Sequence, residues 1–321
     1  MRLLRRNFSA VLLTFSASMA MAWTDKPVKL LVPAPAGGTM DVVARVIAQQ
    51  LSADIGQPVV VDNRPGAGGA IAVQALLQAP ADGLTLMVTA DNILTEIPHV
   101  MKMPYDPLKD IKPIATVARA GMVLVGAPNL TADNIKAVVA YVKANPGKVS
   151  FASYSAGTTS HYAGMILNQK EGLDMQHVPF AGSPPALQQV MGGQIQLMFD
   201  GIVTSMPQIK AGKLKAYGVA GKARSAHLPD VPTLTELGYP ELVFGNWLGV
   251  IASNALPADI TTKVNAAILK AADAPAIKGR LNAVGFEPNT AATSAELSQG
   301  LKADYERNGS IVKRFDIKLA Q

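Results

Sequence analysis

Short apolar runs alternate with helical patterns along most of the chain, and this alternation limits the folds available to it. Val28–Val32 has the length and composition of a buried strand. Apolar residues then recur at helical spacing from Val42 to Leu51, and strand character returns at Pro58–Val61. Strands and helices in this order form parallel sheets covered by helices. The pattern therefore predicts an α/β fold with doubly wound, Rossmann-like sheets.

The alternation continues through the middle of the chain and changes only toward the C-terminus. From residue 242 onward it predicts one long strand followed by three helical segments. The remaining predicted elements are helix Ile71–Leu77, strand Leu84–Val88, strand Val123–Gly126, helix Ala132–Ala144, strand Val149–Ala152, helix Ser160–Gln169, strand Met175–Val178, helix Pro185–Met191, strand Ile195–Phe199, helix Met206–Ala211, strand Leu214–Val219 and strand Leu242–Ala252.

A chain of 321 residues with this many elements is expected to form two domains. We predict a first lobe from residues 23–123 together with 242–321, and a second lobe from residues 124–241. The chain would then cross between the lobes twice. Two crossings make a two-strand hinge.

The first 22 residues have the features of a secretory signal peptide. A basic start is followed by the uncharged apolar stretch Phe8–Met19 and by the small-residue motif Ala20–Ala22. This order predicts export and cleavage after Ala22, and the stretch is too short for a permanent membrane helix. An uncleaved signal anchor is the alternative.

Composition excludes several classes of function. The chain contains no cysteine, which excludes disulfides, thiolate catalysis, cysteine-bound zinc and a lipidated N-terminal cysteine. Removing residues 1–22 takes away three arginines, so the formal charge falls from +6 to +3. The remaining lysines are scattered, and no basic stripe is interleaved with aromatic residues, which argues against nucleic acid as a partner.

The segment Pro33–Asp41 joins the first predicted strand to the first predicted helix. Gly37 and Gly38 allow a close backbone approach to a ligand, and a helix that opens at Thr39 presents free N–H groups and the positive end of its dipole. These features indicate an anion site built from backbone. The alternative, with equal weight, is that Thr39 or Asp41 caps the helix and the glycines only form the turn.

A similar junction in the predicted second lobe, Ser153–His161, is rich in hydroxyl groups. Its hydroxyls and the free N–H groups of the following helix could form a second anion grip, or they could be ordinary helix caps. Two such loops facing each other would hold a dicarboxylate at both ends.

The glycine cluster Arg64–Gly69 does not match a cofactor motif. It fails the dinucleotide spacing and lacks the lysine of a P-loop, so NAD and ATP are disfavoured and no cofactor is expected. Arg64 could pair with a substrate carboxylate, but with Asp62 nearby it could equally hold the loop in place.

Catalytic and metal motifs are not found in the sequence. The chain has no Gly-x-Ser-x-Gly elbow, and its four histidines lack the spacing of metal ligands. We therefore predict neither catalytic residues nor a metal site. A binding receptor is favoured over a periplasmic hydrolase or transferase and over an adaptor for a sensor kinase.

Nine short motifs, taken in order, resemble one family closely: the receptors of tripartite tricarboxylate transporters, also called the Bordetella uptake gene family. The resemblance extends from Pro27 to the C-terminal helices. The motifs are Leu31–Pro33 through Gly37–Thr39 with Asp41, Asn63–Gly69, Tyr105–Asp110, Ala144–Lys148, His177–Phe180, Gly192–Gln194, Met198–Asp200, Ile209–Lys213 and Leu228–Thr233.

The resemblance implies a type II periplasmic binding protein, exported to the periplasm of a Gram-negative cell, that closes two lobes around a carboxylate. It also implies inner-membrane transporter subunits as partners and a monomeric receptor. The ligand-binding residues that it implies in the first lobe are Ala36, Gly37, Gly38, Thr39, Asp41, Thr89, Ala90 and Asn92. Those implied in the second lobe are Ser155, Ala156, Gly157, Thr158, Thr159, Phe180 and Asp200.

One departure from the family concerns ligand choice. Ala34 stands where the family usually has phenylalanine, which predicts a reshaped or roomier pocket. Tyr154, Phe180 and Trp247 are aromatic candidates for stacking on a ring, although Trp247 is more readily explained by core packing. These features favour an aromatic acid such as terephthalate or a related benzoate over a citrate-like aliphatic acid.

Overall fold

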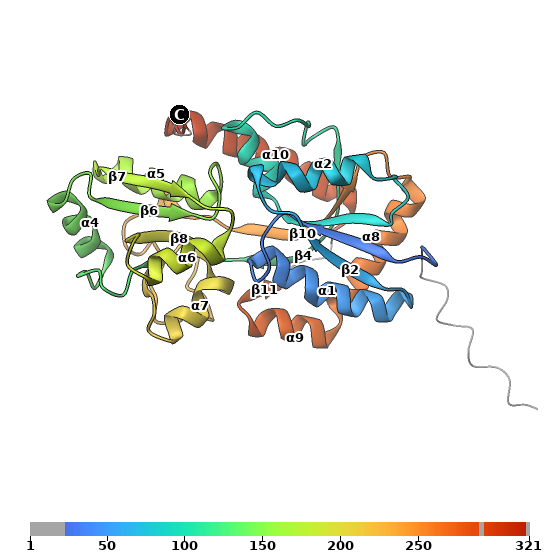
Figure 1. The fold of residues 1–321 in the computed structure, drawn as a ribbon, viewed down its shortest axis with the longest axis horizontal. Helices are drawn as coiled ribbons and strands as arrows, with labels where there is room; N and C mark the ends of the chain where they lie inside the picture. The colour runs from blue at the N-terminus through green and yellow to red at the C-terminus, as the bar shows by residue number, and fades with distance from the viewer. Residues whose placement is uncertain (1–22, 289–291, 319–321) are drawn as a thin grey trace, which may run out of the picture.

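Two mixed β-sheets form the centres of two lobes in the computed structural model, which describes residues 23–288 and 292–318 (Figure 1). The predicted signal peptide, residues 1–22, lies outside the described residues. The first sheet has the strand order β11-β4-β10-β3-β1-β2 and the second has the order β7-β6-β8-β5-β9. The predicted two-lobed α/β fold is confirmed.

The first lobe contains β1 to β4, β10 and β11, with helices on both faces of its sheet. Helix α1 buries an apolar stripe that includes Val43, Ile47 and Leu51, and it ends at Gly56, whose left-handed conformation suits glycine. The strands are β1 (Val28–Val32), β2 (Val59–Asn63), β3 (Thr85–Ala90), β4 (Ile111–Ala120), β10 (Asn246–Ser253) and β11 (Phe286–Pro288). One face carries α1 (Thr39–Ile55), α8 (Ala258–Asp273) and α9 (Pro275–Ala283), and the other carries α2 (Ala70–Gln78), α3 (Asn92–Thr95), η3 (Ile97–His99) and α10 (Ser294–Arg314).

The second lobe is built in the same way around a smaller sheet. Its core includes Phe151, Phe199 and Tyr217, all nearly inaccessible to solvent. The strands are β5 (Met122–Gly126), β6 (Val149–Ser153), β7 (Met175–Pro179), β8 (Leu197–Gly201) and β9 (Lys215–Val219). The helices are α4 (Ile135–Ala144), α5 (Thr159–Glu171), α6 (Ser183–Met191) and α7 (Ile202–Lys210).

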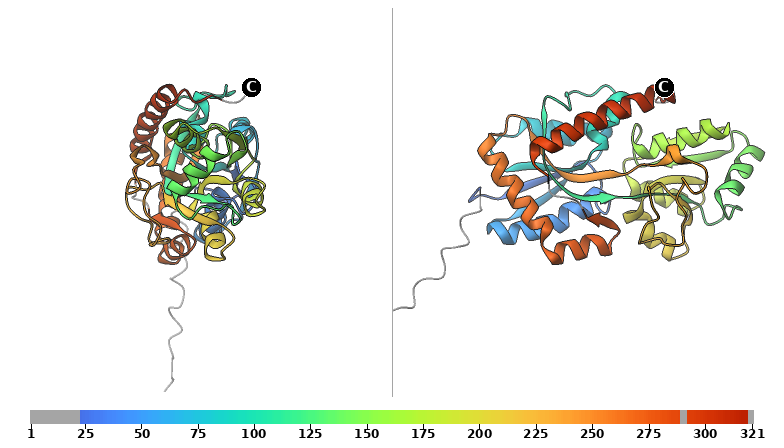
Figure 2. Two further views of the ribbon diagram at one scale, coloured as in Figure 1. Left: turned by 90° about the vertical axis from the view of Figure 1, so that its left-hand side faces the viewer. Right: turned by 180° about the vertical axis from the view of Figure 1, so that it is seen from behind.

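The chain passes between the lobes from β4 into β5 and again on its return into β10, which makes the two crossings of the predicted hinge (Figure 2). The exact limits of the lobes, residues 23–123 with 242–321 and residues 124–241, stay a prediction. Helix α10 adds a link between the lobes, because Leu301 is buried in the first lobe whereas Ile311 and Phe315 pack against the core of the second.

The sheets differ from the wholly parallel sheets that the alternation suggested. β10 runs antiparallel to β3 and β4, and β5 runs antiparallel to β8 and β9, because these strands enter or leave a lobe instead of following a crossover helix. β4 and the short β11 were not predicted. Within the described ranges, no helix is long and apolar enough to span a membrane.

Candidate functional site

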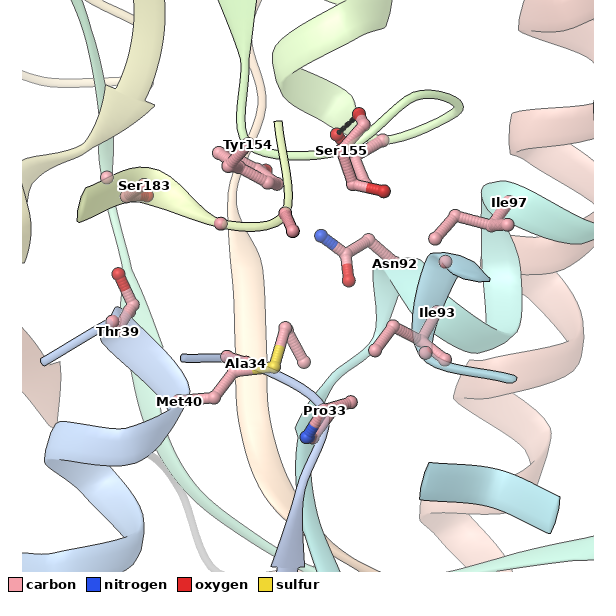
Figure 3. A pocket seen from close by; sticks show the side chains of 18 of the residues that line it. Pro33, Ala34, Thr39, Met40, Asn92, Ile93, Ile97, Tyr154, Ser155 and Ser183 are labelled. Carbon is pink, nitrogen blue, oxygen red and sulfur yellow. Dashed lines mark hydrogen bonds between the residues drawn. The ribbon is translucent and has the colours of Figure 1, made fainter. Parts of the chain in front are cut away.

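A cavity of about 330 Å³ lies between the lobes, where the parallel strands of both sheets end (Figure 3). This is the usual ligand position in open α/β sheets. The lobes touch at one rim, since a methyl group placed on Gly182 would lie 2.5 Å from the Pro35 ring. Of the described residues, none that lines the cavity carries a charged side chain.

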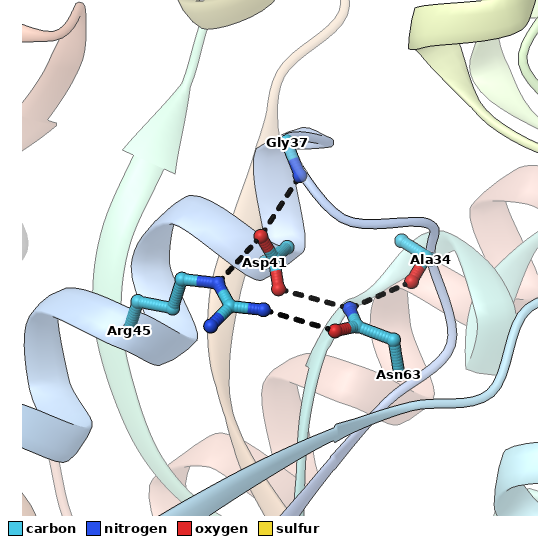
Figure 4. Close-up of polar contacts among 5 residues, drawn as sticks. All are labelled: Ala34, Gly37, Asp41, Arg45 and Asn63. Carbon is cyan, nitrogen blue, oxygen red and sulfur yellow. Dashed lines mark hydrogen bonds and ion pairs between the residues drawn. The ribbon is translucent and has the colours of Figure 1, made fainter.

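Asp41 organises the loop between β1 and α1 (Figure 4). One carboxylate oxygen accepts hydrogen bonds from the Gly37 amide at 2.8 Å and from Arg45 Nε at 2.9 Å, and the other accepts one from Asn63 Nδ2 at 2.9 Å. Asn63 Nδ2 also donates to the Ala34 carbonyl at 2.9 Å. Burial alone would raise the pKa of Asp41, but these hydrogen bonds outweigh it and lower the pKa. Asp41 therefore holds the loop in shape and does not line the cavity.

The start of α1 faces the cavity with donors that the protein does not use. The amides of Gly37 and Gly38 are already bonded, to Asp41 and to the Pro35 carbonyl. The amides of Thr39 and Met40, in the first turn of the helix, have no acceptor among the described residues, and both residues line the cavity. The amides left free at this loop are therefore those of the first helical turn, and an anion grip built from them stays a prediction.

The wall opposite α1 is the start of α6. Ser183 lies across the cavity from Thr39 (Figure 3) and donates its hydroxyl to Asp200 at 2.5 Å. Thr204 and Ser205 donate to the same carboxylate. Burial raises the pKa of Asp200, and the three hydroxyls oppose that rise. Asp200 lies behind the cavity wall, where it positions Ser183.

The start of α5 does not offer its first amide to a ligand. The amide and the hydroxyl of Thr159 both donate to the carboxylate of Glu96, a buried residue of the first lobe. The Gly157 amide donates to His161 Nδ1 at 3.2 Å. Three donors of this junction are therefore already used within the protein, and a second anion grip here stays a prediction. Ser155, Ala156 and Thr158 still line the cavity.

His161 and His177 belong to a stacked aromatic group below this loop. Their ring centroids lie 3.9 Å apart, His177 stacks on Phe151, and the Ser153 hydroxyl lies 2.7 Å from His177 Nε2. Burial lowers the pKa of His161 to about 4 and that of His177 to about 3. Neither ring lines the cavity, and the described part of the chain contains no group of three or more potential metal ligands.

The structure brings about half of the predicted ligand-binding residues to the cavity, and their contacts with a ligand stay a prediction. Those that line it are Gly38, Thr39, Ala90, Asn92, Ser155, Ala156, Thr158 and Phe180. Those that do not are Ala36, Gly37, Asp41, Thr89, Gly157, Thr159 and Asp200. Of the aromatic candidates, Tyr154 and Phe180 line the cavity, whereas Trp247 packs in the core of the first lobe. Arg64 pairs with Asp62 at 3.0 Å.

Sequence reasoning missed an apolar part of the cavity wall. Gly66–Gly69 follows β2, and its turn packs on side chains of the segment after β3. The missed residues of this part are Gly66, Ala67, Gly68, Gly69, Ile93, Ile97 and Met101. Their positions just beyond the ends of two predicted strands were the signal that could have found them.

The chain matches known proteins over most of its length. The family model described as "Tripartite tricarboxylate transporter family receptor" matches residues 43–317. The protein BugT of Bordetella pertussis is 34% identical over 303 residues, which cover 94% of this chain and 92% of BugT.

Two solved structures have the same fold. The periplasmic binding protein BugD superposes with a TM-score of 0.87 at 31% identity, covering 92% of this chain and 99% of BugD. MatC from Rhodopseudomonas palustris, solved with bound malate, superposes with a TM-score of 0.84 at 31% identity, covering 90% of this chain and 99% of MatC. These relatives are solute-binding receptors and not enzymes. The chain belongs to the tripartite tricarboxylate transporter family of receptors.

Proposed function

We propose that this chain is a monomeric periplasmic receptor that closes its two lobes on a small carboxylate and delivers it to inner-membrane transporter subunits. One observation carries the proposal: the first turn of α1 lines the cavity through Thr39 and Met40, whose amides have no acceptor among the described residues, and no charged side chain of those residues lines the cavity. An anion in such a cavity is held by N–H groups and a helix dipole. The malate bound to MatC supports the carboxylate class.

The walls of the cavity favour a ligand with an apolar body. Ile93, Ile97 and Met101 line one part, and Tyr154 and Phe180 come from the second lobe. A planar ring could lie between these groups. An aromatic acid such as terephthalate therefore fits better than citrate, whose three carboxylates would meet apolar groups.

The test is a thermal-shift screen of the mature protein against mono-, di- and tricarboxylates. A ligand at 100 times its dissociation constant adds about 2.7 kcal/mol of stability, which raises the melting temperature measurably. If no carboxylate raises it, the proposal is wrong.

A matched pair of glycine variants locates the site. A Cβ at Gly38 would lie 3.1 Å from the Pro35 carbonyl and 3.6 Å from Ala34, so Gly38→Val should distort the loop and abolish the shift. Gly279 lies exposed on α9 with no atom near its Cβ position, so Gly279→Val should leave the shift unchanged.

Export and assembly have their own tests. N-terminal sequencing of the periplasmic protein should start at Trp23 if the signal peptide is cleaved as predicted. Light scattering after size-exclusion chromatography should give the mass of one chain.

Cells that lack this receptor should fail to take up the identified acid. Uptake should be restored when the gene for the receptor is reintroduced.

A further inference from the structure

Asn92 has a buried oxygen that no group of the protein satisfies. The residue begins α3, one residue beyond the end of β3, and is 2% exposed. Its amide oxygen has no hydrogen-bond partner among the described residues. Buried polar atoms without a partner are rare in native structures, and each calls for an explanation.

The Asn92 side chain reaches into the cavity from the apolar part of its wall (Figure 3). Ile93 and Ile97 flank it on the first lobe, and neither side chain can donate a hydrogen bond. Tyr154 of the second lobe lies near enough that Asn92 opposes the rise in its pKa caused by burial. Tyr154 therefore approaches the Asn92 side chain from the opposite lobe.

The chemistry of the Asn92 amide oxygen determines which ligand group can form a hydrogen bond with it. An amide oxygen only accepts hydrogen bonds, so a ligand carboxylate would repel it and a ligand C–H group would leave it unpaired. An ammonium group would donate, but no carboxylate among the described residues lines the cavity to balance its charge. A neutral hydroxyl group is the donor that fits.

We propose that Asn92 selects ligands by accepting a hydrogen bond from a ligand hydroxyl, so that among acids with a similar apolar body the hydroxylated one binds more tightly, a hydroxybenzoate for example more tightly than terephthalate. This inference rests on the proposed function, because it assigns the second polar group of the same ligand. The carboxylate binds at the first turn of α1, and the hydroxyl binds at Asn92.

Two matched pairs of acids test the selection by titration calorimetry on the mature protein: malate against succinate, and 4-hydroxybenzoate against benzoate. A lost hydrogen bond that leaves a buried oxygen unpaired costs about 10- to 100-fold in affinity. The wild-type protein should prefer the hydroxylated acid by at least that lower factor in one pair. Asn92→Leu should bring the ratio in that pair close to one.

Two further variants separate selection from folding. Asn92→Asp keeps an acceptor at the same place, so it should retain the preference while weakening the binding of every acid through charge repulsion. Asn282→Leu, on an exposed position of α9, should change neither affinity nor ratio.

Equal affinities within both pairs would overturn the inference, as would an Asn92→Leu variant that folds and keeps the wild-type ratio. In either case carboxylate binding, and with it the proposed function, would still stand. A wild-type protein that bound none of the four acids and no other carboxylate would overturn both proposals together.

Discussion

Glu96 of the first lobe caps the helix that begins at Thr159 in the second lobe. Its carboxylate accepts from both the amide and the hydroxyl of Thr159, and the Tyr162 hydroxyl donates to its carbonyl at 2.8 Å. Asn246, on the returning hinge strand, donates to Asp91 at 2.7 Å beside this contact. The positive end of α5 is thus satisfied by a side chain of the other lobe.

Burial of the two carboxyl groups at this contact makes stability depend on pH. Burial raises the pKa of Glu96 to about 8 and that of Asp91 to about 7, and Asp91 adds to the rise at Glu96. The folded protein therefore keeps protons that the unfolded chain releases above about pH 4.5. Stability should therefore fall as the pH rises from about 5 through the folded-state pKa values of about 7 and about 8. Melting temperatures measured across this range check the sign.

Glu96→Gln is the matching variant for that experiment. A glutamine can accept from the Thr159 amide and donate to its hydroxyl without carrying a charge. The melting temperature of this variant should depend less on pH than that of the wild type. Parallel curves for the two proteins would show that Glu96 does not cause the effect.

Asp41→Ala should destabilise the protein and weaken ligand binding, because Asp41 joins Gly37, Arg45 and Asn63. Hydrogen bonds to a charged group contribute about 1.5–3 kcal/mol. We expect a loss of about 2–3 kcal/mol in urea unfolding and a weaker thermal shift by the ligand. Asp54, on the same helix, accepts one hydrogen bond from Gln50, forms a long ion pair with half-exposed Lys270 at 3.8 Å and keeps one oxygen unpaired, so Asp54→Ala should cost less than 1 kcal/mol. Equal losses of unfolding free energy in the two variants would show that Asp41 does not stabilise the loop.

Gly69→Ala should affect both folding and binding. Gly69 has a φ of +86°, and an added Cβ would lie 2.7 Å from Ile93 Cδ1, which lines the cavity. Strain and overpacking together should cost about 2–4 kcal/mol. Gly56→Ala is the control, because Gly56 has a similar φ of +68° with no atom near its Cβ position. It should cost about 1 kcal/mol and leave affinity unchanged. Calorimetry that finds wild-type affinity in Gly69→Ala would refute the effect on the cavity.

Acid should destabilise the second lobe through its stacked histidines. Burial keeps the pKa of His161 near 4 and that of His177 near 3, below the ordinary 6.5, so the unfolded chain binds protons first as the pH falls. The two histidines contribute to the free energy of unfolding above pH 6.5, and this contribution is lost as the pH falls from 6.5 to about 3. This loss of stability on acidification is opposite in sign to the effect of Glu96, which lowers stability as the pH rises. In His177→Phe, which keeps the stack, unfolding should respond less to acid below pH 6.

The sequence predicted most elements and the place of the cavity, because apolar periodicity and the strand ends are local signals. It failed for β4, which contains Pro113. A proline is tolerated there because β11 covers only Ala118–Ala120 on that side of the strand, and this depends on tertiary structure.

The hydrogen-bond partners of the loop amides also could not be predicted from the sequence. Residues 63 and 96 are distant in sequence from the two loops to which they hydrogen-bond. The sequence alone therefore predicted the same free amides at the start of α1 and at the start of α5. Folding brings Glu96 to one of them and leaves the other open.

The cavity also has a consequence for how salt affects this receptor. The polar groups among its described lining residues are backbone dipoles, hydroxyls and side-chain amides, with no lysine or arginine, so an anion there would be held by short-range dipole contacts and not by an ion pair. Mobile ions screen exposed charges strongly and enclosed ones weakly. The affinity for the solute should therefore stay nearly constant between dilute and saline media.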